Sequence, residues 1–240
     1  MVSFAFMKER ENMSALVEIR DISKIYNPGE NEVRALDHIS LTIQKGEFVA
    51  IIGQSGSGKS TLMNMIGCLD VPTEGTYILN GQNVSKLSDN ELSDIRNQEI
   101  GFIFQGFNLI ANLTAQENVE LPLIYRGVPK KERQELSVAA LKKVGLAHRM
   151  DHRPSEMSGG QQQRVAIARA IAQAPPVILA DEPTGNLDST SSMEILDILK
   201  QLHAENRTVI LITHDNDIAK QAKRVIRIKD GRIERDYENE

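Results

Sequence analysis

Residues 53–60, GQSGSGKS, have the types and the spacing that phosphate binding requires. They fit the pattern G-x-x-x-x-G-K-[ST] between the apolar run FVAII and the helix-like stretch TLMNMIG. Glycines let the backbone curl so that successive N–H groups point at an anion, and the following helix adds the positive end of its dipole. The alternative is a chance turn rich in glycine and serine. The strand before it and the helix after it favour a phosphate-binding loop.

This loop is predicted to be a Walker A motif that binds a nucleotide. The ammonium group of Lys59 is expected to neutralise the outer phosphates, and the hydroxyl of Ser60 can ligate Mg²⁺. The predicted nucleotide-binding residues of the loop are Gly53, Gln54, Ser55, Gly56, Ser57, Gly58, Lys59, Ser60 and Thr61.

Two acids, Asp181 and Glu182, follow the apolar run VILA. A carboxylate at the tip of a strand can hold Mg²⁺, usually through water, and we assign this role to Asp181. Glu182 is expected to face the same site, where its carboxylate can orient the attacking water and accept its proton. The alternative is a pair of solvated acids at the end of a strand.

Two further polar residues follow strand-like runs. His214 comes after TVILIT, and its imidazole is expected to donate a hydrogen bond to the γ-phosphate. Gln105 comes after GFIF, and its amide is expected to contact both Mg²⁺ and the attacking water. Either could instead be an ordinary polar residue at a strand end. The predicted catalytic residues are Glu182, His214, Gln105 and Lys59, and the predicted metal ligands are Ser60, Gln105 and Asp181.

A second candidate anion site is MSGGQQQRVAIARA, residues 157–170. The hydroxyl of Ser158 and the N–H groups of Gly159 and Gly160 begin a helix whose positive end favours a negative charge. Because the Walker A loop already surrounds one face of its own nucleotide, we expect this site to contact the nucleotide of another subunit. The ordinary alternative is a capped helix with residues such as Val165 in the core. This core role is expected in addition to phosphate binding, because packing and phosphate binding use different parts of the helix.

Strands that alternate with helices must position these motifs, which predicts an α/β domain with a mostly parallel central sheet. The first, second and fourth strand-like runs are expected to form an antiparallel edge layer, and about 108–172 an inserted helical subdomain. We expect one domain over 1–240, with a flexible N-terminus of about 1–15 and a loose tail of about 234–240. The eight runs begin at Val17, Ile39, Phe48, Thr76, Gly101, Val177, Thr208 and Arg224.

The composition excludes several classes of protein. Charged residues make up 25% and hydrophobic residues 40% of the 240 residues, which is typical of a folded domain. No apolar run approaches the roughly 20 residues of a spanning helix, so the chain is not expected to cross a membrane alone. A net charge of −5 argues against nucleic acid as a partner. The single cysteine, Cys68, fits a buried apolar position better than a reactive thiol.

With GQSGSGKS, Gln105, SGGQQ, ILADE and His214 in this order, the chain resembles the ATPase subunits of ABC transporters. SGGQQ resembles the signature that separates these ATPases from other P-loop NTPases. The resemblance implies that ATP and Mg²⁺ bind, that Tyr26 stacks on adenine, and that two copies pack head to tail around two ATP molecules. It assigns the signature to Ser158, Gly159, Gly160, Gln161 and Gln162, and the D-loop to Asn186, Leu187 and Asp188.

Residues 101–127, with MIGCLDVPTEG and ADEPTGNLD, resemble more closely the MacB and lipoprotein-release (LolD) branch. That branch implies a separate integral-membrane permease, which holds the ATPase at the cytoplasmic face of the cell membrane, and often an extracytoplasmic adaptor. Export or extraction is the expected direction. A group of apolar residues follows Gln105. These residues are expected either to contact the permease or to pack in the core: Phe107, Leu109, Ile110 and Leu113.

Three alternatives remain. A regulatory ATPase like that of the cell-division branch (FtsE-like) would control a membrane complex without moving cargo. A soluble ABC ATPase of DNA repair or translation would usually carry a long coiled-coil insertion or a second cassette. A P-loop kinase or GTPase would not need SGGQQ, and the chain has no N-K-x-D-like guanine motif.

Overall fold

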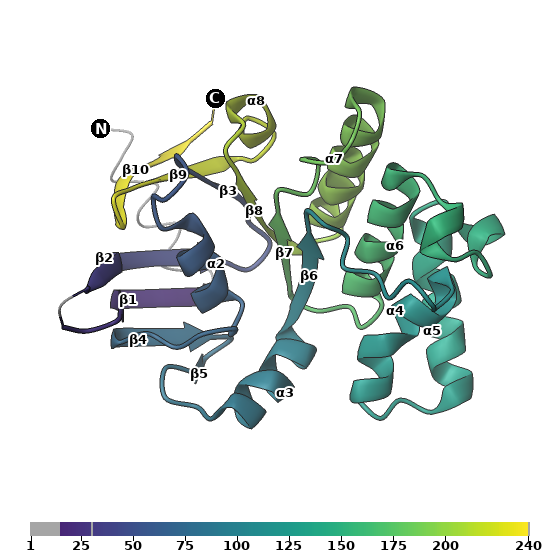
Figure 1. Ribbon diagram of the computed structural model, residues 1–240, viewed down its shortest axis with the longest axis horizontal. Coiled ribbons are helices and arrows are strands. Elements are labelled where there is room, and N and C mark those ends of the chain that lie inside the picture. Colours follow the sequence, from purple (N-terminus) through teal and green to yellow (C-terminus); the bar gives the residue numbers. More distant parts are fainter. Residues whose placement is uncertain (1–14, 30, 240) are drawn as a thin grey trace.

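The computed structural model describes residues 15–29 and 31–239 of the chain (Figure 1). The strands are β1 (Ala15–Tyr26), β2 (Val33–Gln44), β3 (Phe48–Ile52), β4 (Glu74–Leu79), β5 (Gln82–Asn83), β6 (Ile100–Phe104), β7 (Val177–Asp181), β8 (Thr208–Thr213), β9 (Arg224–Lys229) and β10 (Arg232–Glu238). The helices are α2 (Lys59–Ile66), α3 (Asp89–Glu99), α4 (Ala115–Tyr125), α5 (Lys130–Lys143), α6 (Gly159–Ile171), α7 (Ser189–Ala204) and α8 (Asn216–Ala219), with short 3-10 turns at Ala147–Arg149 and Pro154–Glu156.

A six-stranded sheet occupies the centre of the molecule, in the order β10-β9-β3-β8-β7-β6. From β9 to β6 all neighbours are parallel, and only β10 pairs antiparallel. The side chains of β3 alternate between two cores: Phe48, Ala50 and Ile52 belong to one, and Val49 and Ile51 to the other. Both faces of the strand are therefore buried, which explains its unbroken apolar sequence. The predicted α/β fold with a mostly parallel central sheet is confirmed.

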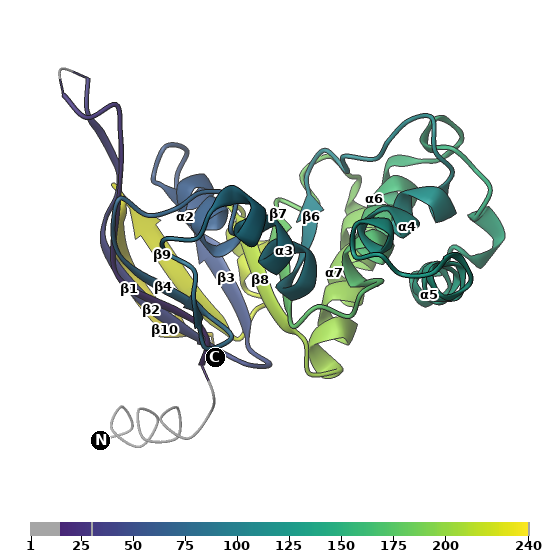
Figure 2. The same cartoon turned by 90° about the horizontal axis from the view of Figure 1, so that it is seen from below.

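A second, four-stranded antiparallel sheet has the order β2-β1-β4-β5. Helix α2 lies between the two sheets (Figure 2), and one core joins all three layers through residues such as Ile19, Leu62 and Ile210. The predicted edge layer is confirmed, because β1, β2 and β4 are the strands expected there. The core fixes where α2 begins, and the phosphate-binding loop ends at that point.

The chain between β6 and β7 is helical and lies at the opposite end of the molecule from the antiparallel sheet (Figures 1 and 2). Helix α6 packs against β6 and α7, and α4 and α5 pack against α6. Val165, Ile167 and Ala168 of α6 are fully buried, as expected for a helix with an apolar core face. In the described part of the chain, none of the helices is both long and apolar enough to cross a membrane.

The expectation of a loose tail is wrong for 234–238. These residues belong to β10, which pairs with β9 from Arg232↔Lys229 to Glu238↔Arg224. The sequence of the tail is polar because β10 is an edge strand with mostly exposed side chains. The expected flexible N-terminus, about 1–15, falls outside the described residues except for Ala15, the first residue of β1.

Candidate nucleotide site

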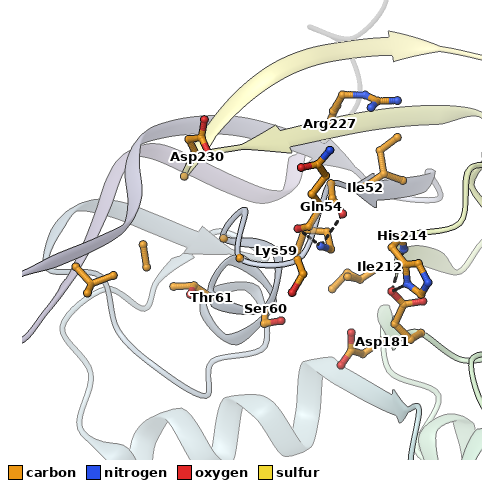
Figure 3. A pocket seen from close by; sticks show the side chains of 18 of the residues that line it. Ile52, Gln54, Lys59, Ser60, Thr61, Asp181, Ile212, His214, Arg227 and Asp230 are labelled. Carbon is orange, nitrogen blue, oxygen red and sulfur yellow. Dashed lines mark hydrogen bonds and ion pairs between the residues drawn. The ribbon is translucent and has the colours of Figure 1, made fainter.

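A cavity of about 1000 Å³ lies where β3, β7 and β8 end and α2 begins (Figure 3). Ligands of open parallel sheets bind at this edge, beyond the carboxyl ends of the strands. The cavity is lined by Val33, Arg34, Ala35, Ile52, Gly53, Gln54, Ser55, Gly56, Gly58, Lys59, Ser60, Thr61, Gln105, Asp181, Glu182, Ile212, His214, Asn216, Arg227, Asp230 and Gly231. It thus brings together every predicted catalytic residue, every predicted metal ligand and every predicted Walker A residue except Ser57.

The loop before α2 has the geometry of an anion cradle. Gly58 has φ +103°, and a Cβ there would lie 2.6 Å from the carbonyl oxygen of Ala35, so only glycine fits. No side chain of the described residues caps the N-terminus of α2, whose first N–H groups are left for a ligand. Lys59 Nζ donates to the carbonyls of Gly53 at 2.7 Å and Gln54 at 2.8 Å, which holds the ammonium group inside the curl of the loop. Ser57, by contrast, is buried.

Three neighbouring strands end level with one another. Phe104 of β6 is opposite Asp181 of β7, which is opposite Ile212 of β8. The residues that follow each strand therefore share one edge of the sheet, as the sequence predicted for Gln105 and Glu182. The pKa of Asp181 is raised by burial and by the neighbouring Glu182, while Lys59 acts in the opposite direction. A nearby cation would favour the ionised form of this carboxylate.

Glu182 and His214 contact each other directly. Oε1 of Glu182 lies 2.6 Å from Nδ1 of His214 and accepts a hydrogen bond from the backbone N–H of His214 at 2.9 Å. Oε2 accepts one from the hydroxyl of Thr213 at 3.0 Å. The histidine is exposed and reaches into the cavity beside Asp181 (Figure 3). The carboxylate and the imidazole are thus one hydrogen-bonded pair at the tip of β8.

Gln105 is joined to Asn186, one of the predicted D-loop residues. Nε2 of Gln105 donates to Oδ1 of Asn186 at 3.3 Å, and Nδ2 of Asn186 donates to the carbonyl of Gln105 at 3.0 Å. Asp188 caps α7, and Leu187 lies against Gly159. Gln105, the D-loop and the start of α6 therefore form one continuous contact.

The predicted signature residues begin α6 as expected. Ser158 accepts a hydrogen bond from the N–H of Gln161, whose side chain accepts one from the N–H of Ser158. Gly160 is buried, and a Cβ there would meet the hydroxyl of Ser191 at 2.7 Å, so the glycine allows α6 to approach α7. In the part of the chain that the structure describes, none of residues 158–162 lines the cavity.

Tyr26 also does not line the cavity. Its hydroxyl donates to Oδ2 of Asp70 at 3.0 Å, and the ammonium of Lys24 lies over its ring, 5.1 Å from the centroid. Burial and Asp70 raise the pKa of the phenol. Its proposed contact with adenine remains a prediction.

Sequence reasoning missed several residues of the site. Arg227 and Asp230 line the cavity because the β9–β10 hairpin lies against the loop, where the N–H of Gly231 donates to the carbonyl of Ser57 at 2.9 Å. The Asp-Gly pair between the two strands is a hairpin signal that could have predicted this turn. Fully buried Gln163 donates to the carbonyl of Pro183 at 2.6 Å, next to Glu182, and no local pattern indicates that contact.

The donor set suits a magnesium nucleotide. The hydroxyl of Ser60, the carboxylate of Asp181 and the amide of Gln105 all line the same cavity, and all are oxygen ligands of the kind Mg²⁺ prefers. No cluster of three or more His, Cys, Asp or Glu residues that could hold a metal occurs in the described residues. Such a cavity fits an ion that takes its remaining ligands from phosphate and water.

Comparison with known proteins agrees with this geometry. The family model described as ABC transporter matches residues 36–185. The chain is 56% identical over 224 residues to the macrolide export ATP-binding/permease protein MacB of Hyphomonas neptunium, covering 93% of this chain and 35% of that protein. It is 55% identical to the ABC transporter ATP-binding protein YvrO of Bacillus subtilis, covering 91% of this chain and 95% of that one. The chain thus spans about a third of the MacB relative.

Among solved structures, the fold matches a dimeric post-hydrolysis state of the ATP-binding cassette MJ0796 bound to ADP and Pi. The TM-score is 0.85 and the identity 47%, over 93% of this chain and 99% of that one. A dimeric structure of the same cassette matches equally well. Both sequence and structure therefore place the chain in the ABC transporter family, as its ATP-binding and ATP-hydrolysing cassette.

Proposed function

We propose that two copies of this cassette close head to tail around two ATP molecules and that the closure drives an export permease of the MacB type. The observation that carries the proposal is the position of the signature. Ser158 is exposed, begins a helix of 13 residues, and does not line the cavity of its own chain. A helix N-terminus of this kind favours a phosphate, which a second copy would supply.

The cavity residues have distinct proposed roles. Lys59 and the loop N–H groups bind the phosphates, and Ser60, Asp181 and Gln105 hold Mg²⁺, which when bound neutralises charge on the phosphate oxygens. Glu182 orients the attacking water and accepts its proton, and His214 binds the γ-phosphate. The hydrogen bonds between Glu182 and His214 support this division, because they place both groups at one point of the cavity.

The permease partner is supported by the relatives and by a groove. MacB relatives carry cassette and permease in one protein by their name, and the matched part is the cassette third. This groove is a cavity of about 780 Å³ between α3, β6 and α4. It combines apolar residues with three arginines, Arg96, Arg126 and Arg169. We propose that an apolar, acidic cytoplasmic segment of the permease binds there, at the cytoplasmic face of the membrane. A macrolide-like drug is the proposed cargo, by similarity to the relatives.

Mixing two inactive variants tests the head-to-tail arrangement. Glu182→Gln removes the base but leaves the signature, and Ser158→Arg blocks the signature but leaves the base. Each alone should hydrolyse ATP about 10²- to 10³-fold more slowly than the wild type. Combined in equal amounts before ATP is added, half of the pairs are mixed and each has one complete site. The mixture should then regain roughly a quarter of the wild-type rate.

The matched control mixes Glu182→Gln with a chain that carries both substitutions, which offers no complete site and should stay inactive. Light scattering should also show that Glu182→Gln alone forms a dimer that persists with ATP. Failure of the first mixture to recover, or full activity of Ser158→Arg by itself, would contradict the proposal.

A further inference from the structure

Thr213 is the last residue of β8, and its side chain is buried at 0% exposure beside the catalytic edge of the sheet. Its hydroxyl donates to Oε2 of Glu182 at 3.0 Å. The hydroxyl oxygen of Thr213 in turn accepts a hydrogen bond from the backbone N–H of Asp215 at 3.1 Å. A hydroxyl has one proton, and a backbone N–H can only donate, so the proton of Thr213 is committed to the carboxylate.

The rest of Glu182 is held by the same strand end. Its backbone N–H donates to the carbonyl of Ile212 at 2.9 Å, and Oε1 accepts from the backbone N–H of His214. Glu182 has φ +43°, in the left-handed region that few residues other than glycine adopt. Three consecutive residues, the last two of β8 and His214 after it, thus fix the backbone and both carboxylate oxygens of a residue in an uncommon conformation.

We propose that Thr213 is a positioning residue for hydrolysis: its hydroxyl fixes the rotation of the Glu182 carboxylate, so that the remaining lone pairs face the attacking water. The backbone N–H of His214 restrains one oxygen only, and the carboxylate could still turn about that contact. The second, charge-assisted hydrogen bond removes this freedom. The inference rests on the proposed role of Glu182 as the base.

Two substitutions separate positioning from packing. Thr213→Val keeps the shape of the side chain and removes the hydroxyl, whereas Thr213→Ser keeps the hydroxyl and removes a methyl group. We expect Thr213→Val to lower kcat roughly 10- to 100-fold with KM for ATP within about twofold, because the variant loses the hydrogen bond that orients the charged carboxylate for the step after ATP binding. The variant also removes the acceptor of the Asp215 N–H, a bond that Thr213→Ser keeps. Thr213→Ser should stay within about threefold of the wild type. A packing role predicts the reverse order, because serine leaves a cavity in a buried site.

The matched control is Thr208→Val at the other end of β8. Thr208 is also fully buried, and its hydroxyl accepts from the N–H of Gly46 at 2.9 Å, far along the strand from Glu182. The kcat of the Thr208→Val variant should equal that of the wild type. Urea unfolding of each variant shows that the compared proteins are folded.

A double-mutant comparison distinguishes the two possible failures. In the Glu182→Gln background, single-turnover hydrolysis should be no slower when Thr213→Val is added, because the hydroxyl acts only through the carboxylate. If Glu182→Gln is itself as fast as the wild type, the proposed base fails and this inference with it. If Glu182→Gln is slow and Thr213→Val is fast, or if the two losses multiply, only the role of Thr213 is refuted.

Discussion

The carboxylates of Asp181 and Glu182 are adjacent in the chain but have different surroundings. Thr213 and His214 donate hydrogen bonds to Glu182, whereas burial and the charge of Glu182 itself raise the pKa of Asp181. An ionised Asp181 is therefore costly in the nucleotide-free protein, although a metal ion needs that ionised form. In the proposed role of Asp181 as a metal ligand, stability is given up for binding, a common arrangement at functional sites.

We predict that Asp181→Asn stabilises the nucleotide-free protein at pH 7 while it weakens binding of magnesium ATP. Because the pKa of Asp181 is raised on folding, its favourable contribution is complete below the unfolded value of about 3.9 and is lost as the pH rises through the folded value. The advantage of asparagine should thus grow with pH and fade towards pH of about 4. Urea unfolding of both proteins at several pH values from about 4 to 7 measures this difference in the free energy of unfolding.

Asp188→Asn is the control with the opposite sign. The backbone and side chain of Ser191 lower the pKa of Asp188. Its contribution is therefore present above about pH 3.9 and is lost as the pH falls through the folded value. Asp188→Asn should destabilise the protein at pH 7, and the difference should vanish on acidification. A stability gain for Asp181→Asn that does not depend on pH would refute the explanation.

At the scale of elements, β10 is held to the sheet by an ion pair as well as by its backbone. Asp236 makes two hydrogen bonds to the guanidinium of Arg224, at 2.7 and 2.6 Å. Arg224 is buried, and its pKa is raised because its contacts with Asp236 and Glu47 outweigh the effect of burial. A polar tail therefore becomes part of the core sheet through one buried cation.

We predict that Asp236→Ala lowers the free energy of unfolding by about 2–3 kcal/mol, because it leaves a buried charge with fewer partners. Glu234→Ala on the same strand is the control. The carboxylate of Glu234 is exposed, with Oε1 3.8 Å from Nζ of Lys229 and Oε2 4.0 Å from Nε of Arg227. Loss of this side chain should change the free energy of unfolding by less than about 0.5 kcal/mol. Urea unfolding compares the two variants. Equal effects would mean that β10 adds little beyond its backbone pairing.

The sequence predicted elements whose signals are local and missed contacts between distant segments. The loop at 53–60 and the buried strands were predictable because spacing and apolar runs act over a few residues. The hydrogen bond from Thr213 to Glu182 joins residues 31 positions apart, and its existence depends on how β7 and β8 align. Likewise, nothing in a polar tail shows that its aspartate reaches a buried arginine. Pairing and tertiary packing decide such contacts, and local propensity does not.

At the scale of the whole molecule, α6 connects the cavity with the groove. Gln163 donates to carbonyls at the end of β6 and after Glu182, at Phe104 and Pro183. Arg169, six residues on, donates to the carbonyls of Phe107 and Asn108 and also lines the groove. The segment around Gln105 is thus held to α6 at both ends. A partner in the groove would contact the helix that carries the signature.

The apolar residues after Gln105 differ in burial, and none of Phe107, Leu109, Ile110 and Leu113 lines the groove. Leu109 packs against the core, whereas Ile110 is 47% exposed. Tyr125, at the end of α4, is 83% exposed and lines the groove. Such exposure of a large aromatic side chain, close to three arginines, is typical of an interaction surface.

We predict that Tyr125→Ala weakens association with the permease about tenfold or more, because exposed aromatic residues in apolar grooves often dominate binding. ATP hydrolysis by the isolated cassette should stay within about twofold, since Tyr125 lies outside the nucleotide cavity. Reconstitution with a permease of the MacB type in proteoliposomes measures the bound fraction and the stimulated rate. Tyr237→Ala is the control: Tyr237 is 40% exposed, but it lies on β10, away from the groove. If both variants bind equally well, the permease docks elsewhere, and the connection from groove to signature through α6 does not carry its signal.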